Sequence, residues 1–368
     1  APILALGGHL KNTVAVAVGE QAVISQHLGD LETAEARASF RAAVGDLRAL
    51  YQLKPAVIAC DPHPDYYATV EAKGAGRLLV PVQHHHAHVA ACMAEHELRG
   101  PVLGVAWDGA GYGPDGTIWG GEFLLADEHV FQRVATFRRF RLPGGERAVK
   151  EPRRAALGLL YEMWGDALFA REGLPPANAF PPSERALLGQ ILQRAVNSPM
   201  TSSVGRLFDA VASLIDLRHR TSFEGQAAMA LEFAVEGLHG DSYPFRITDG
   251  PVGAIRESPL RIIDWEPMIR NILGDARGGL AVGAIAAKFH HALAEIIVAI
   301  AGRAGRERVI LTGGCFQNRY LTERAVRRLR AEGFRPYWHQ RVPSNDGGLS
   351  LGQLYVAAGW QRLRVESG

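Results

Sequence analysis

One pattern of strands and helices occurs twice in the sequence, and this repetition limits the folds open to the chain more than any other feature. Near the N-terminus, three short apolar runs are separated by glycine turns, which predicts a three-stranded β-meander. Helices and strands then alternate. The predicted strands span Pro2–Gly7, Thr13–Val18, Ala22–His27, Lys54–Cys60 and Arg77–Val82, and the predicted helices span Leu31–Tyr51, Tyr66–Lys73 and His85–Leu98.

The same order restarts after residue 100. A second meander, with a turn at Gly111–Gly116, precedes a long helical stretch and further alternation of strands and helices. Two such units in tandem predict an α/β fold of two lobes built from ribonuclease-H-like units, the plan of actin, sugar kinases and heat-shock ATPases. The strands are Val102–Trp107, Thr117–Leu125, Val130–Phe140, Val309–Thr312 and Arg335–Gln340, and the helices are Glu151 to about Gly237 (broken by a loop at Pro175–Pro182), Arg319–Glu332 and Leu349–Leu363.

The length of 368 residues suits two lobes better than a single core. We expect the first lobe to span residues 1–100 and the second 101–368, with a helical insertion at about 151–305. This division allows the closing helix to pack on the first lobe. Proteins of this plan hold a nucleotide between the lobes, so we expect loops that face the cleft to bind it.

Composition excludes several other classes of protein. With 40 basic and 38 acidic residues the chain has neither the charge of a nucleic-acid binder nor a basic membrane-binding stripe. We find no uninterrupted apolar run of membrane-spanning length, and the first residues are typical of a strand rather than a signal peptide. Cys60, Cys92 and Cys315 are too far apart for a disulfide framework or paired zinc ligands. We therefore expect a cytoplasmic protein without nucleic-acid or membrane partners.

The strongest chemical signal is the run Gln83-His84-His85-His86-Ala87-His88, at a junction between a predicted strand and a predicted helix. Residues four apart share one face of a helix, so His84 and His88 can bind one metal ion. Imidazole ligands suit zinc or iron. The alternative is that the run is a solvated strand end, or that one histidine is a hydrogen-bonded core residue.

Two aspartates are candidates for the remaining ligands. Asp108 follows the apolar strand Val102–Trp107, and a carboxylate at that end of a buried strand faces the crevice of an α/β fold. Asp346 lies in Pro343-Ser344-Asn345-Asp346-Gly347-Gly348, before the last helix. Each is also consistent with a local role, Asp108 as an Asx-turn and Asp346 as a helix cap. Together with two histidines they complete a site of the kind that iron and zinc accept.

Paired glycines follow predicted strands in both lobes. They lie in the loops Gly7-Gly8-His9-Leu10-Lys11-Asn12 and Gly313-Gly314-Cys315-Phe316-Gln317-Asn318. Glycine allows the backbone to approach a phosphate or purine closely, and a helix that follows a loop presents free N–H groups. Neither loop is a Walker A motif. A single paired glycine is also typical of a simple turn, but a nucleotide between lobes needs a loop from each.

Charged residues beside predicted turns extend this nucleotide hypothesis. Arg206 and Asp209 lie at the start of a helix, where a ribose or phosphate would dock. Glu224 lies in the turn Phe223-Glu224-Gly225-Gln226. The alternative is that Arg206 and Asp209 only interact with the dipole at the start of their helix, and that Glu224 lies on the solvated surface.

Seven strings occur in this order along the chain: Gly-Gly-His-Leu-Lys-Asn, Cys-Asp-Pro-His-Pro-Asp-Tyr, Gln-His-His-His-Ala-His, Trp-Asp-Gly-Ala-Gly-Tyr-Gly, Gly-Arg-Leu-Phe-Asp-Ala-Val-Ala, Gly-Gly-Cys-Phe-Gln-Asn and Pro-Ser-Asn-Asp-Gly-Gly. Together they resemble the C-terminal half of the hydrogenase maturation carbamoyltransferases, the HypF family. The resemblance covers about Leu4 to Gln353. That half is itself similar to tRNA threonylcarbamoyl transferases and antibiotic O-carbamoyltransferases.

The resemblance implies a reaction. Carbamoyl adenylate, made from carbamoyl phosphate and ATP, gives its carbamoyl group to the C-terminal cysteine thiol of the partner HypE, in the route to the cyanide ligands of nickel–iron hydrogenase. It implies one divalent metal, iron or zinc, and ATP or AMP bound as the adenylate. Lys11, His84 and His88 would be catalytic, with the metal on His84, His88, Asp108 and Asp346 and the nucleotide on Gly7, Gly8, Lys11, Arg206, Asp209, Glu224, Gly313, Gly314 and Asn318.

The chain shows no counterpart of three parts of the whole family pattern. We find no acylphosphatase-like segment, no paired Cys-x-x-Cys motifs and no adenylate-forming YrdC-like domain. We therefore expect those activities on another stretch of the same polypeptide or on a separate one. Two alternative functions remain: an O-carbamoyltransferase acting on a small-molecule hydroxyl, and a non-catalytic nucleotide-binding scaffold.

Overall fold

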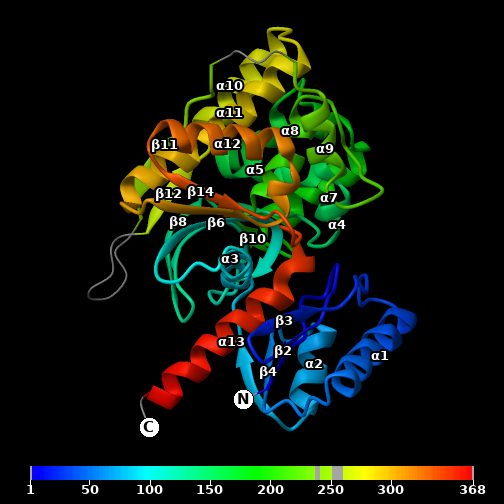
Figure 1. The fold of residues 1–368 in the computed structure, drawn as a ribbon. Helices are drawn as coiled ribbons and strands as arrows, with labels where there is room; N and C mark the ends of the chain where they lie inside the picture. The colour runs from blue at the N-terminus through cyan, green and yellow to red at the C-terminus, as the bar shows by residue number, and fades with distance from the viewer. Residues whose placement is uncertain (1, 237–240, 251–259, 367–368) are drawn as a thin grey trace.

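The computed structural model describes residues 2–236, 241–250 and 260–366, and it contains two β-sheets with helices around them (Figure 1). The first sheet has the strand order β3-β2-β1-β4-β5. β1, β2 and β3 form an antiparallel meander, and β4 and β5 join β1 in parallel. These strands are β1 (Ile3–Ala5), β2 (Ala15–Val18), β3 (Gln21–Ile24), β4 (Val57–Cys60) and β5 (Leu78–Pro81).

The second sheet repeats this order as β8-β7-β6-β13-β14, with β12 and β11 added beside β8. β6, β7 and β8 form the antiparallel meander, and β13 and β14 join β6 in parallel. The shared order confirms the predicted two-lobed α/β fold. The strands are β6 (Val102–Tyr112), β7 (Ile118–Ala126), β8 (Phe131–Phe137), β9 (Phe140–Arg141), β10 (Met200–Thr201), β11 (Arg246–Asp249), β12 (Arg261–Asp264), β13 (Arg308–Thr312) and β14 (Arg335–Trp338).

Two helices cross between the sheets. α3 (His84–Glu95) follows β5 of the first sheet but packs on β6, β7 and β13 of the second. Its Val89, Cys92 and Met93 share an apolar cluster with Val102 and Ile310. α13 (Leu349–Glu366), the red helix of Figure 1, follows the second sheet but packs on β1, β2 and β4 and along α3. This exchange places α3 between the two sheets.

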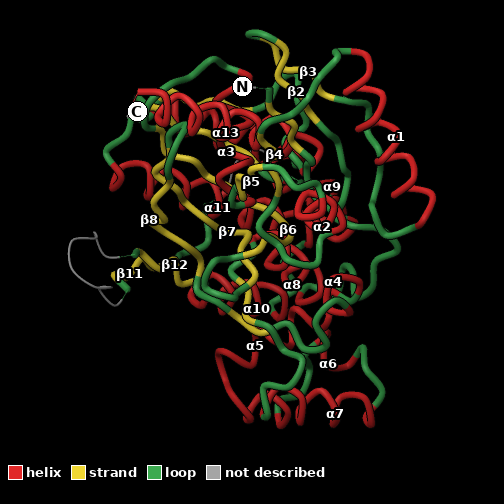
Figure 2. The backbone as a smooth tube through the Cα atoms, turned by 90° about the horizontal axis from the view of Figure 1, so that it is seen from below, coloured by secondary structure: helices red, strands yellow, loops and turns green. Residues whose placement is uncertain are grey.

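The other helices flank the two sheets, and in the tube view of Figure 2 α6 and α7 lie at the end of the molecule opposite to α13 and β3. α1 (Ala34–Leu50) and α2 (Tyr67–Gly74) bury Phe40 and Ala72 against the first sheet. The remaining helices follow β9 in the chain, and all of them except η3 contribute to the large core of the second sheet. They are α4 (Arg147–Lys150), α5 (Pro152–Trp164), η1 (Gly165–Ala170), α6 (Pro175–Asn178), α7 (Pro182–Gln193), α8 (Val204–Leu214), α9 (Gln226–Phe233), α10 (Glu266–Arg277), α11 (Val282–Ala304), η2 (Gly314–Gln317), α12 (Arg319–Ala331) and η3 (Asp346–Gly348).

The structure corrects the sequence predictions in several places. The strand predicted to end at Trp107 continues as β6 to Tyr112, because a shift in its register with β7 between Trp107 and Gly111 keeps the pairing. The predicted helical stretch contains β10, and β11 and β12 also lie within the predicted helical insertion. These short strands depend on distant partners rather than on local pattern. The predicted loop at Pro175–Pro182 contains α6, and the predicted helix end near Gly237 lies outside the described residues.

The search for uninterrupted apolar runs did not detect α11. By length and composition this helix could cross a membrane, with a mean hydropathy of 1.5 in its most apolar window. However, 72% of that window is buried within the protein, and Phe289, Leu293 and Ile297 belong to the core of the second lobe. A helix that is apolar all round is also what the centre of a large core requires.

Candidate metal centre and adjoining cavity

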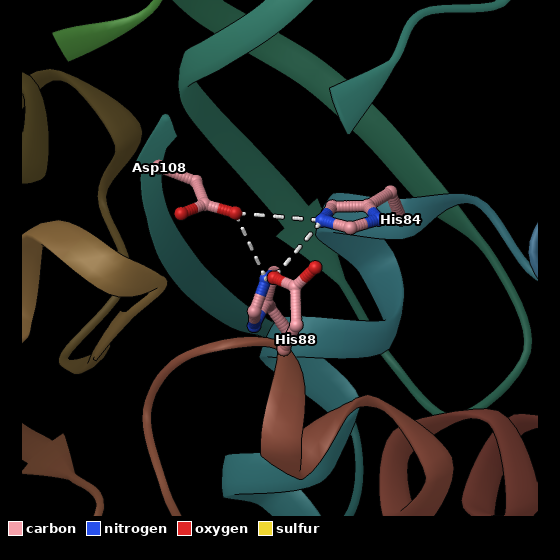
Figure 3. A group of neighbouring side chains, drawn as sticks. His84, His88 and Asp108 are labelled. Atoms are coloured by element: carbon pink, nitrogen blue, oxygen red, sulfur yellow. Dashed lines mark hydrogen bonds and ion pairs between the residues drawn. The ribbon is translucent and has the colours of Figure 1, made fainter. Parts of the chain in front are cut away.

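Four side chains from distant parts of the chain converge between the two sheets: His84, His88, Asp108 and Asp346. The Oδ2 atom of Asp108 lies 3.4 Å from Nε2 of His84 and 3.3 Å from Nε2 of His88 (Figure 3). The Oδ1 atom of Asp346 lies 3.6 Å and 3.5 Å from the same two nitrogens. The structure therefore brings together all four residues that the sequence proposed as metal ligands.

Each histidine is oriented by the first turns of α3. The side chain of Gln83 caps the helix by accepting a hydrogen bond of 2.9 Å from the backbone N–H of His86. With the helix starting at His84, the side chains of His84 and His88 lie one turn apart on the same face. Both side chains are almost completely buried.

Asp108 is held at the irregular part of β6. Its backbone carbonyl accepts a hydrogen bond of 2.6 Å from Oγ of Ser203, and its Oδ1 accepts one of 3.1 Å from the backbone N–H of Gly314. A side chain at Gly314 would not fit, because a Cβ atom there would lie 2.7 Å from that Oδ1. The backbone N–H of Gly314 therefore holds the carboxylate of Asp108 directly.

Asp346 starts η3, the short helix before α13, and its carboxylate points at the histidines. Asn345, rather than Asp346, caps η3 by accepting a hydrogen bond of 3.0 Å from the backbone N–H of Gly347. Gly8 lies against the same segment, and a Cβ atom there would be 3.3 Å from Oδ2 of Asp346.

A third carboxylate lies behind the cluster. Oδ2 of Asp61, which directly follows β4, is 2.8 Å from Nδ1 of His84, and both side chains are buried. A hydrogen bond at Nδ1 fixes the orientation of the ring and leaves Nε2 to face the other ligands. Asp61 was not among the residues predicted for the site, although it follows a predicted strand, as Asp108 does in the sequence.

The histidines and carboxylates of this cluster each favour the charged form of the other, as the directions of their pKa shifts show. Burial by itself would lower the pKa of His84, but the carboxylates of Asp346, Asp108 and Asp61 outweigh it and hold that pKa well above its ordinary value. Burial would raise the pKa of Asp108, yet His84 and His88 bring it well below its usual range. A site that stabilises positive charge between anionic carboxylates also favours a divalent cation.

The donor atoms fit one small metal ion. In a tetrahedral zinc site with bonds of about 2.0–2.2 Å, neighbouring ligand atoms are about 3.3–3.6 Å apart. The four nitrogen-to-oxygen distances fall between 3.3 and 3.6 Å, and all four donor atoms lie within 4.8 Å of one another. Two imidazoles and two carboxylates are ligands that both zinc and iron accept.

A cavity of about 100 Å³ adjoins the cluster and shares Asp108 and Asp346 with it. Lys11, which has a left-handed backbone with φ 46°, enters this cavity from the first lobe. Its ammonium group forms an ion pair with Glu224 of the second lobe. Burial would lower the pKa of Lys11, but Glu224 outweighs it and raises that pKa, so the group stays cationic.

Arg206 and Asp209, both on α8, line this cavity. Nη1 of Arg206 lies 2.8 Å from Oδ2 of Asp209, and both side chains are buried. Burial raises the pKa of Asp209 to about 6, against the opposing charge of Arg206. Nε of Arg206 has no hydrogen-bond partner among the described residues, whereas Oδ2 of Asp209 is the ion-pair partner of Nη1. Nε of Arg206 is therefore a polar atom available to a ligand.

The structure gives structural roles to three residues that the sequence proposed for the nucleotide. Asn318 caps α12 by accepting from the backbone N–H of Leu321, and its amide contacts His290. Gly313 has φ 96° and lies against the backbone of Trp107. Gly7 is held by the side chain of Gln353 through both its backbone N–H and its carbonyl. Lys11, Arg206, Asp209, Glu224 and Gly314 line the cavity.

Comparison with known proteins agrees with the geometry. Residues 1–95 match the model of the HypF Kae1-like domain, and residues 104–353 match that of the carbamoyltransferase Kae1-like domain, second subdomain. The chain belongs to the HypF family of carbamoyltransferases. It corresponds to the carbamoyltransferase half of those proteins.

Curated HypF proteins are similar along almost the whole chain. Carbamoyltransferase HypF of Synechocystis sp. is 43% identical over 96% of this chain and 46% of its own length. A carbamoyltransferase HypF homolog of Cupriavidus necator is 37% identical over 97% of this chain and 92% of its own length. The chain thus spans about half the length of most of the HypF relatives that it matches.

Solved HypF structures share the fold. A full-length HypF in a phosphate- and nucleotide-bound form superposes with a TM-score of 0.89 at 38% identity, over 98% of this chain and 55% of that one. HypF of T. kodakarensis superposes with a TM-score of 0.85 at 29% identity, over 98% of this chain and 48% of that one. The first of these HypF proteins binds phosphate and a nucleotide.

Proposed function

We propose that this chain transfers a carbamoyl group from carbamoyl adenylate to the C-terminal cysteine thiol of HypE during hydrogenase maturation. The observation that carries the proposal is the convergence of His84, His88, Asp108 and Asp346 beside a cavity that contains Lys11. Membership of the HypF family supports the carbamoyl group as the group transferred. The reaction would take place in the cytoplasm.

In the proposed reaction, the thiol sulfur forms a bond to the carbamoyl carbon. The bond from that carbon to the phosphate oxygen breaks, AMP leaves, and the thiol proton passes to solvent. A zinc or iron ion held by His84, His88, Asp108 and Asp346 would act as a Lewis acid on the carbamoyl or phosphate oxygen. Lys11 would offset the charge that develops on the departing phosphate.

The nucleotide has to separate two residues that contact each other in this structure. Lys11 is paired with Glu224 across the cavity, so a phosphate must replace that carboxylate beside the ammonium group. The released Glu224, together with Asp209, offers acceptors for the ribose hydroxyls. Arg206 keeps Asp209 in place through their buried ion pair.

The donor would come from the part of the relatives that this chain does not cover. We propose that YrdC-like and acylphosphatase-like domains, on the same or a separate polypeptide, form carbamoyl adenylate from carbamoyl phosphate and ATP. A separated half would work slowly with them, because tethering supplies a high local concentration of the intermediate. The adenylate is also protected from water when it passes directly between sites.

The test supplies carbamoyl adenylate and HypE to the purified chain and measures the mass of the HypE C-terminal peptide. We expect one added carbamoyl group, and none on a HypE variant whose terminal cysteine is replaced by serine. Carbamoyl phosphate and ATP alone should give no product. Absence of transfer from supplied carbamoyl adenylate would contradict the proposal and favour a nucleotide-binding scaffold. Transfer to the serine variant would favour an O-carbamoyltransferase.

A further inference from the structure

A buried carboxylate lies two helical turns beyond His88 on α3. The side chain of Glu95 is 1% exposed, and its Oε2 is 3.0 Å from Nδ1 of His339. Its Oε1 accepts hydrogen bonds of 2.8 Å and 2.5 Å from the backbone N–H groups of Gln340 and Arg341. No role was predicted for Glu95 or His339, and neither belongs to the group of His84, His88, Asp108 and Asp346.

His339 continues this chain of contacts toward the metal ligands. Its Nε2 is 2.9 Å from Oγ1 of Thr312, and that hydroxyl lies 3.1 Å from the backbone carbonyl of His88. Thr312 is completely buried at the end of β13. Hydrogen bonds therefore tie α3 to the second sheet at two points, Glu95 and His88.

The same contacts fix the loops that carry the two aspartates. Thr312 directly precedes Gly313 and Gly314, and the backbone N–H of Gly314 holds Asp108. The backbone N–H of Gly313 donates a hydrogen bond of 3.0 Å to the carbonyl of Ser344, two residues before Asp346. One network of hydrogen bonds thus joins the segments that carry the four proposed ligands.

We propose that Glu95, His339 and Thr312 are positioning residues that set the spacing of the metal ligands. This inference rests on the proposed metal site. None of the three side chains touches the ion in this account. They act by holding α3, the Gly314 loop and the segment before Asp346 in register, so that four donor atoms stay within reach of one ion.

Physical considerations favour this role over a purely structural one. A metal site binds tightly only when its ligands are already close to the bound geometry, and residues behind the ligands commonly change metal affinity by about 10–100-fold. Burial would raise the pKa of Glu95, but His339 and the backbone donors lower it to about 2, so the carboxylate is ionised and accepts from all its partners.

The test compares hydroxyl variants at two buried threonines. Thr312→Val removes the contacts to His339 and His88 but keeps the branched shape, whereas Thr312→Ser keeps the hydroxyl. Thr322→Val is the matched control, because the Thr322 hydroxyl bonds the carbonyls of Phe316 and Asn318 and contacts neither His339 nor a proposed metal ligand. Metal affinity is measured by titration with Zn²⁺ and, without oxygen, Fe²⁺, beside thermal unfolding of the metal-free proteins.

We expect Thr312→Val and Glu95→Gln to weaken Zn²⁺ binding by about 10–100-fold. Thr312→Ser and Thr322→Val should bind Zn²⁺ like the wild type, even if Thr322→Val unfolds at a lower temperature. Unchanged affinity in Thr312→Val and Glu95→Gln would overturn the positioning role alone, as would an equal loss in Thr322→Val. A wild-type chain that binds neither ion would overturn the proposed metal site and this inference with it.

Discussion

At the scale of single residues, the ring orientation of His84 is the detail on which the metal centre most depends. A histidine can present either ring nitrogen, and the contact between Nδ1 and Asp61 selects Nε2 for the site. The carboxylate also adds negative charge behind the ligand, which strengthens binding of a cation. Asp61 would therefore strengthen binding of a metal ion at the proposed site without touching that ion.

Replacing Asp61 with asparagine should weaken this support. The amide keeps the size of the side chain but loses the charge, so we expect Asp61→Asn to lower Zn²⁺ affinity by about 10–100-fold. The control is Asp65→Asn in the same loop, at an exposed position. Competition with a coloured chelator measures both affinities. Equal Zn²⁺ binding by the wild type and Asp61→Asn would show that His84 needs no such partner.

The four residues of the proposed metal site could be selected from the sequence because their patterns are local. The spacing of His84 and His88 is a property of one helix, and Asp108 and Asp346 each stand beside a predicted strand or helix. Contacts between residues that are distant in the sequence form only on folding, so no local pattern predicts them. Glu95 and His339 are 244 residues apart, and no local pattern joins them. For the same reason, the glycine pattern alone did not show that Gly313 faces the backbone of Trp107.

At the scale of elements, the close packing of α13 on α3 determines where the histidines lie. Gly352 of α13 permits this approach, because a Cβ atom there would lie 1.8 Å from the carbonyl oxygen of Ala87. Ala87 directly precedes His88. A change at Gly352 therefore reaches the metal site through the backbone of α3.

We expect Gly352→Ala to lower the free energy of unfolding by about 1–3 kcal/mol, because the helices must separate. Gly45→Ala on α1 is the control, since a Cβ atom there meets nothing within 4 Å. The control should raise stability by about 0.5–1 kcal/mol, as is usual for alanine in a helix. Urea unfolding measures both. If Gly352→Ala also raised the free energy of unfolding, the close approach of α13 to α3 would not be needed for stability.

The Glu95 network also predicts how stability changes with pH. The pKa of Glu95 is lowered to about 2, so the ionised group stabilises the folded state above its unfolded pKa of roughly 4.3. That contribution is lost as the pH falls from there toward 2. The wild type should therefore lose more stability than Glu95→Gln between about pH 5 and pH 2.5, as followed by urea unfolding at each pH. Parallel curves for the two proteins would contradict this expectation.

At the scale of the whole molecule, each lobe is completed by a helix from the other part of the chain. α3 packs on the second sheet and α13 on the first, so the proposed metal ligands lie where both lobes meet. The sequence predicted the two sheets through their repeated order of elements. The exchange of helices was allowed by that order but not specified by it, because packing partners are tertiary information. The division into residues 1–100 and 101–368 stays a proposal.

The central claim is that both lobes hold one metal ion on His84, His88, Asp108 and Asp346. The most direct measurement is the metal content of the purified chain, with and without nucleotide, beside a double variant His84→Ala, His88→Ala. We expect one zinc or iron ion per wild-type chain and none in the double variant, whose folding is checked by circular dichroism. A folded double variant that keeps its full metal content would contradict the account.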